Sequence, residues 1–113
     1  MIKIYHNPRC GKSREGLAIL EESGKEFKVI KYLENRLSLT ELTEIIDLLG
    51  IEPIDLVRQN EAFWKENYKG KRISKEHIVK LMLSNPKLME RPIVVNGKKA
   101  VIGRPPEKIK EIL

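Results

Sequence analysis

The chain opens with a strand–helix–strand pattern, which constrains its fold more than any other feature of the sequence. Ile2 and Ile4 alternate with polar neighbours, as in a short strand. Residues 11–23 have the pattern of a helix, with Gly24 as its C-terminal cap, and residues 26–33 have the pattern of a second strand. Two strands joined by one helical crossover pair in parallel, so the sequence predicts an α/β fold.

The middle of the chain has a helical pattern. Ser38 or Thr40 can cap a helix that ends at Gly50, Pro53 can begin a short helix, and Ser74 opens a further one. The stretch between the last two is polar, and we assign it no element. We therefore expect a helical insertion over about residues 38–85.

The C-terminal third returns to strand patterns. The β-branched runs PIVV and AVI flank an Asn-Gly pair, a strong hairpin signal, and RPPEKIKEIL closes the chain with a helix. The order is β-α-β, helices, then β-β-α. At 113 residues the chain is long enough for a single domain, 1–113, with its own core.

Composition narrows the function classes. No uncharged apolar run could span a bilayer and the first residues lack a secretory signal, so we expect a cytoplasmic protein with no membrane partner. We also expect a monomer, because the domain is small and shows no assembly motif. The net charge of +6 is spread among glutamates, except at residues 69–72, and only 5% of residues are aromatic. This disfavours a nucleic-acid partner and favours attraction of a small anion.

Cys10, the only cysteine, lies in the stretch NPRCGKSR, and several motifs can be excluded there. A phosphate-binding P-loop requires a glycine five residues before Gly11, where His6 stands. The C-x5-R loop of cysteine phosphatases fails because Gly16 is the sixth residue after the cysteine, and a C-x-x-C pair fails because Ser13 is the third. One cysteine and two histidines also make a poor metal site, so we expect none.

Once these motifs are excluded, what remains is a single thiol at the junction of a strand and a helix. The unpaired amides at a helix N-terminus stabilise a thiolate or an oxyanion, and we expect nearby His6, Arg9, Lys12 and Arg14 to add positive charge. The alternative is a buried structural cysteine. The polar and basic surroundings favour the reactive thiol.

The motifs IYHNPRCGKSR, LVRQNE, ERPIVV and IGRPPEKI, in this order, resemble those of the glutaredoxin-coupled arsenate reductases, the ArsC family, which is related to the Spx regulators. The resemblance implies a thioredoxin-like fold with a helical insertion. It also implies a catalytic cysteine, a histidine that helps to hold the thiolate, three oxyanion-binding arginines and a cis-proline facing the site. These are Cys10, His6, Arg58, Arg91, Arg104 and Pro92, respectively.

Each arginine also has a simpler explanation. Arg58 could be an exposed cation at a helix end, Arg91 could pair with a neighbouring carboxylate, and Arg104 could interact with Glu107. Guanidinium groups nevertheless suit arsenate, a tetrahedral oxyanion, because they bind its oxygens in bidentate fashion.

The resemblance implies that arsenate is reduced to arsenite through a covalent adduct on Cys10. Glutathione would be the co-substrate and glutaredoxin a partner, with no bound cofactor. A lone cysteine independently requires an outside thiol, because the chain offers no second sulfur to resolve the adduct. Two alternatives are a monothiol glutathione-dependent transferase and an Spx-like regulator that binds RNA polymerase and senses oxidation. Ser13 removes the C-x-x-C switch of the latter.

Overall fold

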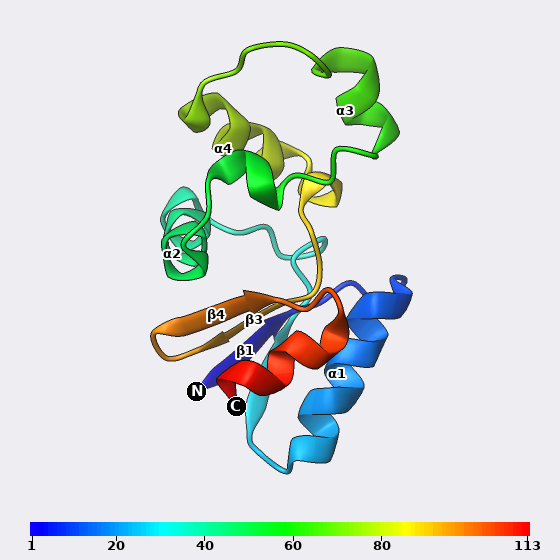
Figure 1. Cartoon of the computed structure of the whole chain (residues 1–113), viewed down its shortest axis with the longest axis vertical. Helices are drawn as coiled ribbons and strands as arrows, with labels where there is room; N and C mark the ends of the chain where they lie inside the picture. Colours follow the sequence, from blue (N-terminus) through cyan, green and yellow to red (C-terminus); the bar gives the residue numbers. More distant parts are fainter. The chain divides into compact units, whose positions relative to one another are not determined.

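The sheet of this protein is built from both ends of the chain. The computed structural model describes all 113 residues, and its four strands lie in the order β2-β1-β3-β4 (Figure 1). β1 pairs in parallel with β2 and antiparallel with β3, which in turn pairs antiparallel with β4. The strands are β1 (Ile2–Tyr5), β2 (Phe27–Ile30), β3 (Ile93–Asn96) and β4 (Lys99–Ile102).

Helix α1 (Gly11–Ser23) connects the two parallel strands, as the sequence predicts. It ends at Gly24, whose φ of 73° is the left-handed conformation that glycine adopts without a Cβ penalty. Leu20 of α1 is fully buried in a core that includes Ile4 of β1 and Val94 of β3. Burial of these apolar side chains holds the helix against the sheet.

The predicted hairpin is present, and its turn lies within the expected connection, residues 96–99. Asn96 is the last paired residue of β3, opposite Lys99, so Gly97 and Lys98 form the two-residue turn. Gly97 has a φ of 63°, as required at the first central position of a type II′ turn. The side-chain amide of Asn96 donates a hydrogen bond of 2.7 Å to the carbonyl of Ile112, near the C-terminus.

The last element, η3 (Pro106–Ile112), is a 3₁₀-helix that begins at the second of two consecutive prolines. Its Ile109 is fully buried in the same core as Ile4 and Leu20. Two glycines allow this packing: a Cβ at Gly16 of α1 would lie 2.9 Å from Ile109 Cδ1, and one at Gly103 would lie 3.1 Å from it.

The chain divides into two compact units, one comprising Met1–Asn35 with Arg91–Leu113 and the other Arg36–Glu90. The second unit is helical, and the sequence predicted an insertion at about 38–85. Its elements are α2 (Leu39–Leu49), η1 (Pro53–Leu56), α3 (Ala62–Asn67), α4 (Lys75–Ser84) and η2 (Pro86–Leu88). None of the helices is long and apolar enough to cross a membrane.

Side-chain caps define where two of these helices begin. Ser38, and not Thr40, is the N-cap of α2: its hydroxyl accepts from the amide of Glu41, whose carboxylate accepts in return from the amide of Ser38. Ser74 caps α4 by accepting from the amide of His77 at 3.1 Å.

Helix α3 was not expected, because its stretch is polar and has no side-chain cap. It forms around Trp64, which is 4% exposed, with its ring centroid 5.4 Å from that of Tyr68. Burial of one large aromatic side chain favours helix formation here more than the local sequence pattern does.

Candidate active site

Cys10 lies at the junction that the sequence predicts. β1 ends at Tyr5, a short loop follows, and Cys10 is the N-cap residue of α1 with an extended backbone (φ −97°, ψ 124°). Its amide donates to the carbonyl of Asn7 at 3.0 Å, and its own carbonyl accepts from the amide of Arg14 at 3.0 Å. The thiol is partly buried and free. It therefore occupies the positive end of a 13-residue helix.

A buried polar network lies beneath this loop. Ser13 is fully buried, and its hydroxyl oxygen lies 2.7 Å from Nδ1 of His6 and accepts from the amide of Asn7 at 3.0 Å. Asn7 is also buried, and its Oδ1 accepts from the amide of Arg9 at 3.0 Å. The network fixes the loop before Cys10 to the first turn of α1. Sequence reasoning missed Asn7, and it noted Ser13 only as the residue that replaces a second cysteine.

His6 does not supply the positive charge expected of it. Burial lowers the pKa of His6, and the positive charges of Lys31 and Arg14 lower it further, against a hydrogen bond with Ser13 that raises it. The imidazole is therefore neutral near pH 7, because its ordinary pKa is already about 6.5. Its contribution to the site is its hydrogen bond and not its charge. Its predicted role in stabilising the thiolate stays a prediction.

Two of the three predicted arginines, Arg91 and Arg104, belong to the same compact unit as Cys10. Arg104 Nη2 donates to Cys10 Sγ at 3.5 Å, and Arg104 Nε donates to the backbone carbonyl of Arg91 at 2.8 Å. One guanidinium thus contacts both the sulfur and the segment that carries the second arginine.

The first amides of α1 and the guanidinium of Arg91 set the charge state of the thiol. Burial raises the pKa of Cys10, but the backbone amide of Ser13, the guanidinium of Arg91 and the amide of Lys12 lower it. The net effect is a pKa below the ordinary value for cysteine. Each lowering contribution acts by stabilising the thiolate.

Pro92 lies where the two arginine segments pack against α1. The Arg91–Pro92 peptide bond is cis, and so is Arg104–Pro105, which the sequence analysis did not anticipate. The carbonyl of Pro92 accepts from the amide of Gly103 at 2.8 Å. A Cβ at Gly16 would lie 2.8 Å from Pro92 Cγ, so the absence of a side chain there lets the proline approach the helix.

Arg58 belongs to the helical unit. Its amide donates to the carbonyl of Leu88 at 2.6 Å, and its guanidinium forms an ion pair with Glu61 at 3.4 Å. Both side chains are about a quarter to a third exposed, at 26% and 32%. Its predicted role as a third oxyanion ligand stays a prediction.

The arrangement supports thiol chemistry: a sulfur with a lowered pKa lies at a helix start, beside cationic groups able to bind an oxyanion. Nowhere in the chain do three His, Cys, Asp or Glu side chains gather as a metal site would require. The mixed sheet, its helical crossover and this lone cysteine together define a thioredoxin-like protein with a single-thiol site.

Comparison with known proteins identifies the family. The ArsC family model matches residues 5–112, so the chain belongs to the ArsC family. It is 48% identical over 114 residues to YfgD of Escherichia coli K12, an uncharacterised protein, covering 99% of this chain and 96% of that one. It is 43% identical over 112 residues to an arsenate reductase of Haemophilus influenzae, covering 97% of each.

A solved structure of an arsenate reductase from Vibrio cholerae has the same fold. It is similar to this chain with a TM-score of 0.94 and 46% sequence identity, covering 99% of this chain and 97% of that one. The predicted α/β, thioredoxin-like fold class is thereby confirmed.

Proposed function

We propose that this protein reduces arsenate to arsenite, with Cys10 as the nucleophile. The observation that carries the proposal is the contact of Arg104 Nη2 with Cys10 Sγ at 3.5 Å, in a protein whose relatives include arsenate reductases. An arginine on a reactive sulfur places a bidentate oxyanion ligand beside the nucleophile.

Substrate binding would use the guanidinium groups of Arg104 and Arg91, with Arg58 as a third ligand. The amides at the start of α1, which also stabilise the thiolate, would take the oxygen nearest the sulfur. Arg104 and the loop before α1 are fixed before the substrate arrives, because Arg104 is held by the carbonyl of Arg91 and the loop is held by Ser13. Such preorganised charge favours the transition state, in which negative charge builds on the arsenate oxygens.

The reaction would begin with attack of the Cys10 thiolate on arsenic(V). A sulfur–arsenic bond forms and one arsenate oxygen leaves as water after protonation, which gives a covalent adduct. Glutathione then attacks the Cys10 sulfur, and the electron pair of the sulfur–arsenic bond stays on arsenic. Arsenite is released as arsenic(III), and Cys10 and glutathione are joined in a mixed disulfide. Two thiols have lost two electrons in all, and arsenic has gained them.

Regeneration of Cys10 requires a further thiol from outside the chain, because Cys10 is the only cysteine. We propose glutaredoxin in this role and glutathione as the co-substrate, with no bound cofactor. Such chemistry suits a reducing compartment such as the cytoplasm, where mixed disulfides are cleared continuously. We assign the protein to that compartment as a monomer.

The test is arsenite release from arsenate by the purified protein with glutathione and glutaredoxin. We expect turnover by the wild type and none by Cys10→Ser, with the fold of the variant verified by its circular dichroism spectrum. Omission of glutathione should also stop turnover. Wild-type protein that is inactive with arsenate but reduces a glutathionylated substrate would establish the transferase instead. Inactivity in both assays together with capture of RNA polymerase would establish the regulator.

A further inference from the structure

The helical unit contains a cavity that the proposed reaction does not use. Its volume of about 460 Å³ lies in the range of small-molecule sites. Its walls come from η1, from α3 with the loop that follows it, and from α4. The lining divides into an apolar floor and a charged rim.

The floor is formed by side chains that the fold already holds in place. Trp64 is 4% exposed and Ile78 is 6% exposed, and Pro53, Ile54 and Ile73 complete the apolar lining. Trp64 is further fixed by its ring contact with Tyr68 at 5.4 Å. A rigid apolar floor favours a ligand with an aromatic or aliphatic body, whose burial supplies most of the binding free energy.

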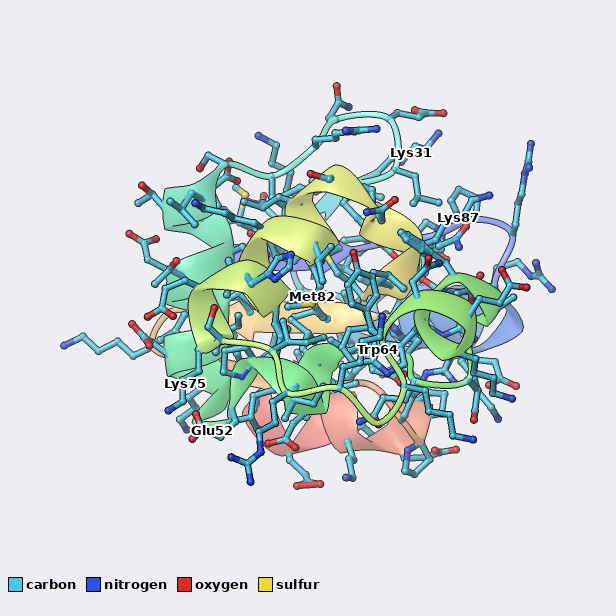
Figure 2. The ribbon with its side chains drawn as sticks, turned by 90° about the horizontal axis from the view of Figure 1, so that it is seen from above. Lys31, Glu52, Trp64, Lys75, Met82 and Lys87 are labelled. Atoms are coloured by element: carbon cyan, nitrogen blue, oxygen red, sulfur yellow. The ribbon has the colours of Figure 1, made fainter.

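The rim carries an excess of positive charge. Lys75 Nζ lies 2.9 Å from Glu52 Oε1, so these two charges compensate each other, and Figure 2 shows the pair side by side. Lys71 and Arg72 also line the cavity, are exposed, and have no carboxylate within 4.0 Å. They belong to the one concentrated basic run of the sequence, residues 69–72, for which the proposed reaction has no use.

We propose that this cavity binds a small amphipathic carboxylate. The apolar body would lie against Trp64 and Ile78, and the carboxylate would be bound by Lys71 and Arg72. An inorganic oxyanion lacks the apolar body that the floor requires, and a neutral apolar molecule leaves the two cations unused. The site is independent of Cys10 and of the proposed arsenate chemistry.

The test uses Trp64, the only tryptophan in the chain, as a fluorescent reporter of the cavity floor. The full-length protein is titrated with 4-phenylbutyrate and, as the matched neutral compound, with 4-phenylbutanol. We expect a saturable change in Trp64 emission with the carboxylate and weaker binding of the alcohol. High salt should weaken only the binding of the carboxylate.

Variants test whether binding requires the two cations of the rim or only positive charge elsewhere on the surface. Each exposed charge pair contributes up to about a fivefold change in affinity, so we expect the double variant Lys71→Ala, Arg72→Ala to bind 4-phenylbutyrate about two- to 25-fold more weakly. Lys80→Ala is the control, because Lys80 is a further exposed lysine of α4 that does not line this cavity. Its affinity should equal that of the wild type. Thermal unfolding verifies that all variants are folded.

Several results would overturn the proposal. These are an emission change that does not saturate, equal affinity for the alcohol, or equal affinity in the double variant. Competition by inorganic phosphate, with loss of the signal in Arg104→Gln, would also overturn it, because the ligand would then be bound at the Cys10 site. None of these outcomes bears on arsenate turnover, so the two proposals fail independently.

Discussion

The sulfur of Cys10 is subject to opposing effects, and the balance between them determines whether it can act as a nucleophile. Burial favours the neutral thiol, whereas the amides of Ser13 and Lys12 and the guanidinium of Arg91 favour the thiolate, which prevails. Arg104 adds a contact to the sulfur itself. Ser13 also forms hydrogen bonds with His6 and Asn7, so the positions of the residues around the sulfur depend on the buried network beneath it.

The contact between Arg104 and Cys10 gives a first prediction. Arg104→Lys keeps the positive charge but loses the planar guanidinium fork that contacts both the sulfur and the carbonyl of Arg91. Hydrogen bonds to charged groups contribute about 1.5–3 kcal/mol, so we expect kcat/KM for arsenate to fall by about tenfold or more. Steady-state kinetics measure this change. Arg36→Lys, at an exposed arginine outside the site, should leave kcat/KM unchanged. An equal kcat/KM for Arg104→Lys and wild type would exclude Arg104 from substrate binding.

Residues of the site differ in how far the sequence could reveal them. Cys10, Arg91 and Arg104 stand in motifs, and the structure describes all three in one unit, with Arg104 on the sulfur. Ser13 and Asn7 could not be found in this way, because the value of a buried hydroxyl or amide lies in partners that only the folded loop supplies. The charge of His6 was misjudged for the same reason, since its burial is not visible in a polar stretch of sequence.

Helix α1 contains one glycine, Gly16, that has no room for a side chain and another, Gly11, that has room for one. This difference gives a prediction for the stability of the helix packing. A Cβ at Gly16 would lie 2.8 Å from Pro92 Cγ and 2.9 Å from Ile109 Cδ1, so Gly16→Ala must displace one of them. Overpacking of this kind typically costs about 1–3 kcal/mol in the free energy of unfolding. Gly11→Ala is the matched control on the same helix, because its Cβ meets no atom closer than 3.8 Å. Urea denaturation measures both changes, and equal stability of the two variants would show that Pro92 and Ile109 yield without cost.

The start of helix α2 gives a second prediction of this kind. Ser38→Ala removes the hydroxyl that accepts from the amide of Glu41 and leaves that donor without its cap. We expect the free energy of unfolding to fall by about 1 kcal/mol. Thr40→Ala, at the other residue that the sequence offered as a cap, lies inside the helix and should change it by no more than about half of that. A larger loss for Thr40→Ala than for Ser38→Ala in urea denaturation would contradict the assignment of the cap.

The sequence predicts the overall architecture better than it predicts individual elements. Apolar periodicity and turn residues give the parallel pair, the helices and the hairpin, because these patterns report which face of each element is buried. Helix α3 was missed because its formation depends on the burial of Trp64, a tertiary effect. The Asn-Gly pair predicted the hairpin but not its register, which is decided by the pairing of Asn96 with Lys99.

The stability of the whole molecule should depend on pH through the buried histidine. The pKa of His6 lies below 6.5 in the folded protein, whereas in the unfolded chain it returns to about 6.5. Between these two pKa values the unfolded state binds more protons, so the free energy of unfolding falls as the pH falls through this range. The contribution of His6 is therefore fully present above about pH 6.5 and is lost as the pH drops through the lowered pKa.

Cys10 also makes the free energy of unfolding rise with pH, but at higher pH than His6, because its pKa is likewise lowered on folding. Its contribution is present above the pKa of the unfolded thiol, about 8.5, and is lost as the pH falls through the folded value. We expect the free energy of unfolding, measured with urea from about pH 5 to pH 9, to rise with pH up to about 6.5 through His6 and up to about 8.5 through Cys10. His6→Asn should flatten the acidic range, since its amide can still reach Ser13 but does not titrate, and Cys10→Ser should flatten the alkaline one. An unchanged acidic slope in His6→Asn would mean that another group titrates there, and that burial of His6 does not destabilise its charged form.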